Sequence, residues 1–169
     1  MISAVSNRGL MRFMLYEGAL NADRFIAFLR RLIKDAGRKV LLIVDNLKVH
    51  KAGRVQAWVK SHAHEIELFY LPSYAPDRNP TEYLNNDLKQ QLRQQPQPGS
   101  KEELIRSAQV LRAIQRSPRR VRAYFKPEPV RYAARCVRYS LGRLVTDPRS
   151  TEGHVQRLIS GERPLKPGP

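Results

Sequence analysis

The chain has 169 residues, the size of one ordinary domain with room for a short extension. Its 31 lysines and arginines against 15 aspartates and glutamates give a net charge of +16, which favours a polyanionic partner. No apolar stretch approaches the roughly 20 residues of a membrane span, so the composition favours nucleic acid over lipid.

The cysteine content and the first residues bear on the cellular compartment. The single cysteine, Cys136, excludes an internal disulfide framework and fits a reducing cytoplasm. The N-terminal residues lack the basic segment and long apolar core of a signal peptide. We therefore expect a cytoplasmic protein.

The N-terminal part of the chain predicts a hairpin followed by a helix. Apolar residues 2–5 and 10–16 flank the turn formers Asn7 and Gly9, which is typical of a β-hairpin. A helix is predicted from Asn21, its N-cap, and Gly37 ends it. Its buried stripe follows the helical spacing and consists of Phe25, Phe28, Leu29, Leu32 and Ile33.

An unbroken apolar run from Val40 to Val44 predicts a strand that is buried on both faces. The run ends abruptly on Asp45. In open α/β sheets, chemistry tends to occur just beyond the carboxyl end of such a strand. A second reading stays open, because Asp45 and Asn46 are also residues that end a strand and begin a turn.

Residues 51–95 predict two more helices around a strand. The first helix runs from about Lys51 to Ala63, and the strand covers residues 66–71. A rigid loop with three prolines then leads to Asn79, which caps a helix that begins at Pro80. Glu82 lies in the first turn of this helix, where it is either a functional carboxylate or the partner of the Asn79 cap.

Residues 96–169 are the more basic part, with 16 basic and 6 acidic side chains. A helix is predicted from Ser100 to about Arg116, and positive charge is densest between Arg116 and Arg138. We expect residues 1–95 to form a catalytic core, residues 96–135 a helical and basic extension of the same domain, and residues 136–169 a weakly ordered tail. Within the basic segment, the arginines at 119, 120 and 122 are either DNA contacts or a solvated face.

Asp45 and Glu82 are the candidate metal ligands. Two carboxylates on different rigid elements suit hard divalent cations such as Mg²⁺ or Mn²⁺, which prefer oxygen ligands. With two ions, one activates an attacking oxygen while the other stabilises the leaving oxygen of a phosphoryl displacement. The pattern therefore favours metal-dependent chemistry on nucleic acid.

Several segments share an order and spacing that identify a family. They are Val44-Asp45-Asn46 followed by His50, Leu-Pro-Ser-Tyr-Ala-Pro at 71–76, the stretch 79–89 that begins Asn-Pro-Thr-Glu, and residues 3–9, 120–125 and 130–134. Together they closely resemble the DDE endonuclease domain of bacterial insertion-sequence transposases in the mariner-like superfamily, over about residues 2–134. The resemblance implies a ribonuclease H-like α/β fold in which two aspartates and a glutamate hold two Mg²⁺ or Mn²⁺ ions that cut DNA at transposon ends and join it to a target. By this resemblance Asp45 is the second aspartate and Glu82 is the glutamate.

The chain departs from the family pattern in two ways. Leu47 and Lys48 stand where relatives often carry histidine and proline, and Asn85 stands where many have tryptophan. In the family, the first aspartate lies on a central strand that precedes the hairpin, and this sequence has no such strand. We therefore expect an incomplete ribonuclease H-like fold with its first central strand missing, and a transposase fragment that is inactive alone.

The resemblance implies DNA, both transposon ends and target, as the partner, and bacterial nucleoid as the location. A homodimer is left open, and a membrane is not expected. The predicted DNA-binding residues are Lys48, His50, Arg119, Arg120 and Arg122. One alternative is a non-enzymatic basic DNA-binding remnant or regulator of transposition. Another, a ribonuclease H or resolvase-type nuclease, does not share the Asn-Pro-Thr-Glu loop.

Overall fold

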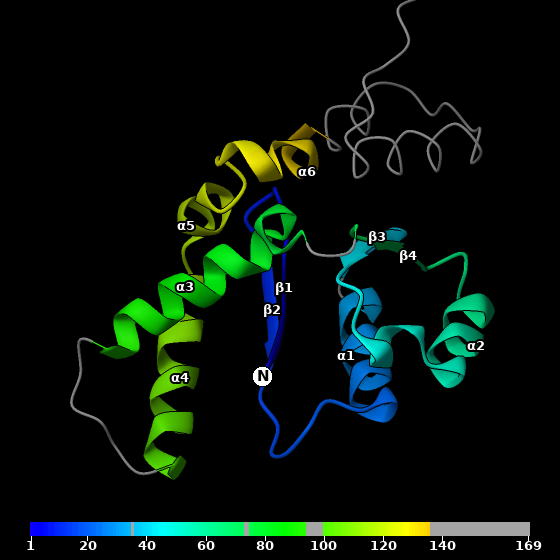
Figure 1. Cartoon of the computed structure of the whole chain (residues 1–169), viewed down its shortest axis with the longest axis horizontal. Coiled ribbons are helices and arrows are strands. Elements are labelled where there is room, and N and C mark those ends of the chain that lie inside the picture. Colours follow the sequence, from blue (N-terminus) through cyan, green and yellow to red (C-terminus); the bar gives the residue numbers. More distant parts are fainter. Residues whose placement is uncertain (35, 73–74, 94–99, 136–169) are drawn as a thin grey trace, which may run out of the picture.

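The computed structural model describes residues 1–34, 36–72, 75–93 and 100–135, so the predicted tail over 136–169 lies outside the described residues. Figure 1 shows the arrangement of the helices and strands. In chain order they are β1 (Ile2–Val5), β2 (Met11–Met14), α1 (Ala22–Lys34), β3 (Val40–Val44), the 3₁₀ turn η1 (Lys48–Lys51), α2 (Gly53–Ser61), β4 (Ile66–Tyr70), η2 (Pro76–Arg78), α3 (Pro80–Arg93), α4 (Ser100–Gln115), α5 (Pro118–Ala123), η3 (Glu128–Val130) and α6 (Arg131–Arg135).

The N-terminal hairpin is confirmed. Strand β1 pairs antiparallel with β2, with Ile2 opposite Met14 and Val5 opposite Met11. The backbone N–H of Ser6 donates to the carbonyl of Leu10 at 2.8 Å and closes the turn. The second strand is shorter than the predicted run over 10–16.

A parallel pair, β3 and β4, is the second strand unit, with Val40 opposite Ile66 and Val44 opposite Tyr70. Helices α1 and α2 supply the rest of its core. Asn21 caps α1 as predicted, because its Oδ1 accepts the N–H of Arg24 at 2.9 Å. The buried residues of this core are Phe25, Ile26, Leu29, Val44, Val55 and Ile66.

The expectation that β3 is buried on both faces is wrong for this structure. Val40, Leu42 and Val44 pack in the core with α1 and α2. Leu41 on the opposite face is 43% exposed, and Ile43 beside it is half-buried. The reason is that Phe69, Leu71 and Tyr132 cover this second face beside Ile43, while Leu41 belongs to none of the hydrophobic clusters of the described residues.

Another core joins the hairpin to the C-terminal helices. Met11 of β2 is buried among residues of α3, α4 and α5, which include Leu84, Leu111, Ile114 and Val121. The basic segment that follows α4 is therefore partly an interior element: α5 and α6 each place residues in this core. The helix predicted from about Lys51 to Ala63 is shorter in the structure: α2 covers Gly53–Ser61, and Lys51 belongs to the preceding turn η1.

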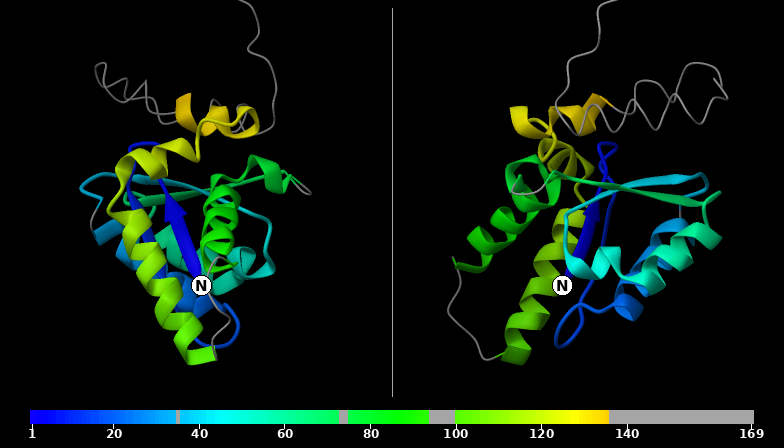
Figure 2. Two further views of the ribbon diagram at one scale, coloured as in Figure 1. Left: turned by 90° about the vertical axis from the view of Figure 1, so that its left-hand side faces the viewer. Right: turned by 45° about the vertical axis from the view of Figure 1, so that its right-hand side comes forward.

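The described strands form two separate pairs. Strand β1 is hydrogen-bonded to β2 and β3 to β4, and no ladder joins β1 to β3 within the described residues. Figure 2 shows the hairpin and the parallel pair as distinct units, with α1 and α2 beside the parallel pair. The mixed α/β class is confirmed, and the described strands do not make one continuous sheet.

Candidate functional site

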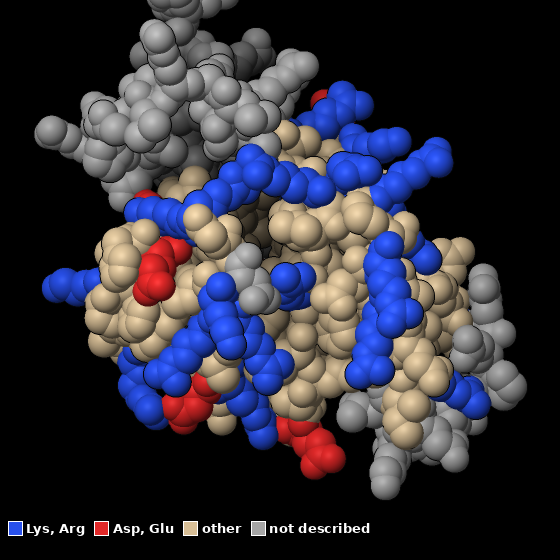
Figure 3. Space-filling model, turned by 180° about the vertical axis from the view of Figure 1, so that it is seen from behind, with Lys and Arg blue, Asp and Glu red and all other residues tan. Residues whose placement is uncertain are grey.

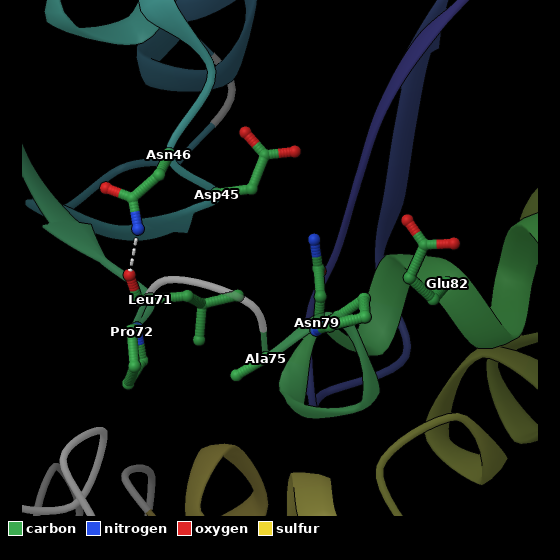
Figure 4. Close-up of a pocket in the computed structure, with 8 residues that line it drawn as sticks. Asp45, Asn46, Leu71, Pro72, Ala75, Asn79 and Glu82 are labelled. Carbon is green, nitrogen blue, oxygen red and sulfur yellow. Dashed lines mark hydrogen bonds between the residues drawn. The ribbon is translucent and has the colours of Figure 1, made fainter.

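The side chain of Asp45, which directly follows β3, is oriented by the backbone. Its Oδ1 accepts the backbone N–H of Leu47 at 3.2 Å, which is the Asx turn that an aspartate favours after a strand. The side-chain amide of Asn46 donates to the carbonyl of Leu71, just beyond β4 (Figure 4). The N–H of Leu71 donates back to Val44 at 2.9 Å. These bonds lock the carboxyl ends of β3 and β4 together.

Glu82 is placed by the start of α3. Oδ1 of Asn79 accepts the N–H of Thr81 at 3.1 Å and its hydroxyl at 2.7 Å, which confirms the predicted cap. Pro80 is buried and begins the helix. No hydrogen bond joins the Glu82 carboxylate to Asn79 among the described residues, so the Glu82 side chain takes no part in capping the helix.

Asp45 and Glu82 face one pocket. Its volume is about 170 Å³. Figure 4 shows the polar ends of Asp45, Asn79 and Glu82 turned to the same side of it. At roughly 30 Å³ per water molecule, this space is large enough for ions with a few waters. The lining residues are Asp45, Asn46, Leu71, Pro72, Ala75, Pro76, Asn79 and Glu82.

The Asp45 carboxyl is kept ionised by its neighbours. Nδ1 of His50 lies 2.9 Å from Oδ1 of Asp45, and this hydrogen bond is the largest influence that lowers the pKa of Asp45. Partial burial opposes it, and the N–H of Leu47 adds to the lowering of the pKa. At neutral pH the side chain is therefore an anion, which is the form that binds a cation.

The donor set fits a hard cation in part. The two carboxylates supply oxygen ligands of the kind that Mg²⁺ and Mn²⁺ prefer. No group of three or more His, Cys, Asp or Glu side chains in the described part of the chain is arranged to hold a metal ion. Asp45 and Glu82 are therefore two candidate ligands, and the described residues add no third.

The predicted DNA-binding residues fall in different surroundings. Lys48 is exposed in η1, close in sequence to Asp45, and Arg119 and Arg122 are exposed on α5. His50 is 6% exposed and faces Asp45. Arg120 forms a salt bridge with Asp87 of α3. Figure 3 shows that lysines and arginines also spread widely over the rear face of the molecule, where acids are few.

Asp87 is a residue whose role the sequence reasoning missed. Arg120 donates to both of its oxygens, at 2.8 and 2.5 Å, and the Tyr124 hydroxyl donates to it as well. Burial raises the pKa of Asp87, and the bonds from Arg120, Tyr124 and Gln91 outweigh that effect and lower it. Burial and then Asp87 raise the pKa of Tyr124. The available signal was the i, i+4 spacing of Arg120 in α5 and Tyr124 at its C-cap, which puts both on the same side of the helix.

The geometry defines a mixed α/β domain with two carboxylates at the ends of a strand and a helix, an arrangement suited to metal-dependent phosphoryl chemistry. Residues 1–105 match the family model of the DDE superfamily endonuclease, and because this is more than half of the chain, the protein belongs to that family. The match confirms the resemblance drawn from the motifs. No curated protein and no solved structure matches the chain. None of the helices in the described residues is long and apolar enough to cross a bilayer.

Proposed function

We propose that this chain is the catalytic part of a bacterial insertion-sequence transposase, which cuts DNA at transposon ends and joins it to a target. The observation that carries the proposal is the pair of carboxylates, Asp45 and Glu82, which reach one pocket from separate elements of a DDE endonuclease domain. DNA is the substrate class of this family. The net charge of +16 supports the same partner.

Asp45 and Glu82 are the residues that would hold Mg²⁺ or Mn²⁺, two ions in the complete enzyme. Such ions stabilise charge on the attacking and leaving oxygens of a phosphoryl displacement. The chain's own residues prepare the site for them. His50 and Leu47 keep Asp45 ionised and oriented, Asn46 ties the ends of β3 and β4 together, and Asn79 fixes the first turn of α3.

We further propose that the chain by itself does not turn over. Among the described residues, no third carboxylate joins Asp45 and Glu82 in a group that could hold a metal ion. The separation of the β1–β2 and β3–β4 pairs supports this proposal, because a ribonuclease H-like sheet has its first strand between them. Such a strand would pair backbone groups of β1 and β3 that have no ladder partner on that side among the described residues.

Metal binding tests the carboxylate assignment. Titration of the purified chain with Mn²⁺ should show binding that weakens at least about tenfold in Asp45→Ala and in Glu82→Ala, because each removes a ligand. Asp23→Ala, which removes an exposed acid of α1, is the matched control and should bind Mn²⁺ like the wild type. Equal affinity in all four proteins would contradict the assignment.

A nicking assay tests the proposed inactivity. The purified chain with Mg²⁺ and a labelled transposon-end duplex should cut no faster than the Asp45→Ala/Glu82→Ala variant. Cutting that is clear in the wild type and lost in Asp45→Ala would overturn the proposed inactivity and leave the metal assignment in place.

A non-enzymatic DNA-binding function is the second candidate, supported by the exposed Arg119 and Arg122 of α5 and by the high net charge. It predicts DNA binding that ignores sequence, falls steeply with salt and is unchanged by Asp45→Ala and Glu82→Ala. Binding that prefers transposon ends and depends on Mn²⁺ and Asp45 would favour the transposase.

A further inference from the structure

His50 occupies an unusual place for a polar residue. It is the one polar or charged side chain in the buried set of the described residues, with 6% exposure. Its ring lies against Phe25 of α1, with the two ring centroids 4.4 Å apart. A buried imidazole without a hydrogen-bond partner is costly, so its partner matters to the fold and to any site that it adjoins.

The backbone of His50 is held independently of its ring. Its carbonyl accepts the side-chain amide of Gln56 at 3.0 Å and the hydroxyl of Tyr70 at 3.1 Å. The Gln56 amide also donates to the Tyr70 hydroxyl at 2.6 Å. Gln56 of α2 and Tyr70 of β4 therefore fix the backbone of His50 and place its ring beside the end of β3.

The ring contacts one oxygen of Asp45. Nδ1 of His50 lies 2.9 Å from Oδ1 of Asp45 and 3.2 Å from the Asp45 carbonyl oxygen. Since both neighbours are acceptors, Nδ1 carries the hydrogen. Leu47 also donates to Oδ1. Within the described residues no hydrogen bond reaches Oδ2, and the Asp45 side chain is 45% exposed.

We propose that His50 is a positioning residue, which holds Asp45 by Oδ1 so that Oδ2 is presented to the pocket shared with Glu82. The expected effect of His50 on metal binding rests on the proposed function, whereas the orientation of Asp45 by His50 does not. This role differs from the direct DNA contact that the sequence predicted for His50, because a ring that is buried against Phe25 and bonded to Asp45 acts through that carboxylate.

The substitutions separate the hydrogen bond from the packing. His50→Phe keeps an aromatic ring against Phe25 and removes the donor. His50→Asn places an amide nitrogen close to the position of Nδ1 and restores the donor. His62→Phe is the matched control, because His62, a half-buried histidine, also lies against an aromatic ring, that of Trp58, at 4.1 Å between centroids. Thermal unfolding checks that each variant folds, and His50→Leu replaces His50→Phe if the latter does not.

The first readout reports the orientation of Asp45 without any metal. The amide resonance of Leu47 senses the Asp45 carboxylate, to which it donates at 3.2 Å. It should shift in His50→Phe, return toward the wild-type position in His50→Asn and stay unchanged in His62→Phe. A Leu47 resonance that is the same in folded His50→Phe and wild type would overturn the proposal.

The second readout is the Mn²⁺ affinity of the same proteins. Loss of a residue that orients a metal ligand weakens binding about 10- to 100-fold, so we expect at least about tenfold in His50→Phe, with recovery in His50→Asn. Full Mn²⁺ affinity in folded His50→Phe would contradict the positioning role. If the Leu47 resonance shifts in His50→Phe but the wild-type chain binds no Mn²⁺, the result supports the positioning role of His50 and counts against the proposed metal site.

Discussion

At the scale of single residues, the two oxygens of Asp45 have different tasks. Oδ1 serves the fold, because Leu47 and His50 both bond to it. No hydrogen bond from the described residues reaches Oδ2, which under the proposed function binds the metal ion. The two readings that the sequence left open for Asp45, turn former and functional acid, are therefore compatible in one side chain. A carboxylate can do both because its two oxygens together offer about four acceptor sites.

Gly9 provides the residue-scale prediction. Its φ is +89°, and a Cβ built there would lie 2.6 Å from the carbonyl oxygen of Pro118 at the start of α5. Gly9→Ala should therefore lower the free energy of unfolding by about 3 kcal/mol or more, from the left-handed backbone and the clash together. Gly37 has a similar φ of +62° with nothing within 4 Å, so Gly37→Ala should cost only about 1 kcal/mol.

Urea denaturation of the two glycine variants measures the difference. If Gly9→Ala lowers the free energy of unfolding no more than Gly37→Ala does, the close contact between Gly9 and Pro118 at the start of α5 is contradicted.

At the scale of elements, Asp87 fastens α3 to α5. Its pKa is lowered in the folded chain, so its bonds to Arg120 and Tyr124 contribute stability above the unfolded pKa of about 3.9, and this is lost as the pH falls through the folded value. Asp87→Asn should cost about 2 kcal/mol at pH 6, the usual loss for a charged hydrogen bond. The gap between wild type and variant should shrink as the pH falls toward 2.

The exposed pair of Asp23 and Arg54 is the control for the Asp87 prediction. Their side chains are 63% and 72% exposed, so Asp23→Asn should change the free energy of unfolding by less than about 1 kcal/mol. Denaturant unfolding at several pH values compares both variants. A difference between wild type and Asp87→Asn that is independent of pH would contradict the ionised state of Asp87.

The start of α3 gives a second prediction at this scale. Asn79→Ala removes the acceptor for the Thr81 N–H and should cost about 1 kcal/mol, whereas Asn79→Ser keeps a capping oxygen and should cost less. Chemical denaturation measures both. The same cap sets the first turn of α3, which carries Glu82. Equal stability of Asn79→Ala and wild type would disprove the structural role of Asn79.

At the scale of the whole molecule, local patterns predicted the elements well and their surroundings poorly. The apolar run gave the bounds of β3 correctly, and Asn21 and Asn79 cap their helices as expected. The expected burial of Leu41 was wrong, because what covers a sheet face depends on segments distant in sequence. The bonds of Asp87 were missed for the same reason, because they join α3 to a residue 33 positions further along the chain. The bond between His50 and Asp45 spans only five residues and was missed because the segment after β3 has no regular periodicity.

The spread of charge over the molecule leads to the last prediction. A chain with a net charge of +16 should bind duplex DNA with an affinity that falls linearly on a log–log plot against salt concentration. If the exposed arginines of α5 bind phosphates, Arg119→Ala/Arg122→Ala should reduce the steepness of that plot by up to about 1.8, which is about 0.9 for each phosphate that is no longer neutralised. Fluorescence anisotropy with a labelled duplex measures the slope.

A matched double variant separates local binding from total charge. Arg30 and Arg31 are exposed on α1, which lies apart from α5 in Figure 1, so Arg30→Ala/Arg31→Ala removes the same charge elsewhere. Its slope should change by less than that of the α5 variant, because an arginine bound directly to a phosphate releases counterions and a distant charge does so weakly. Equal slopes in the two variants would mean that DNA is held by the overall positive field, and α5 would then have no special part in the interface.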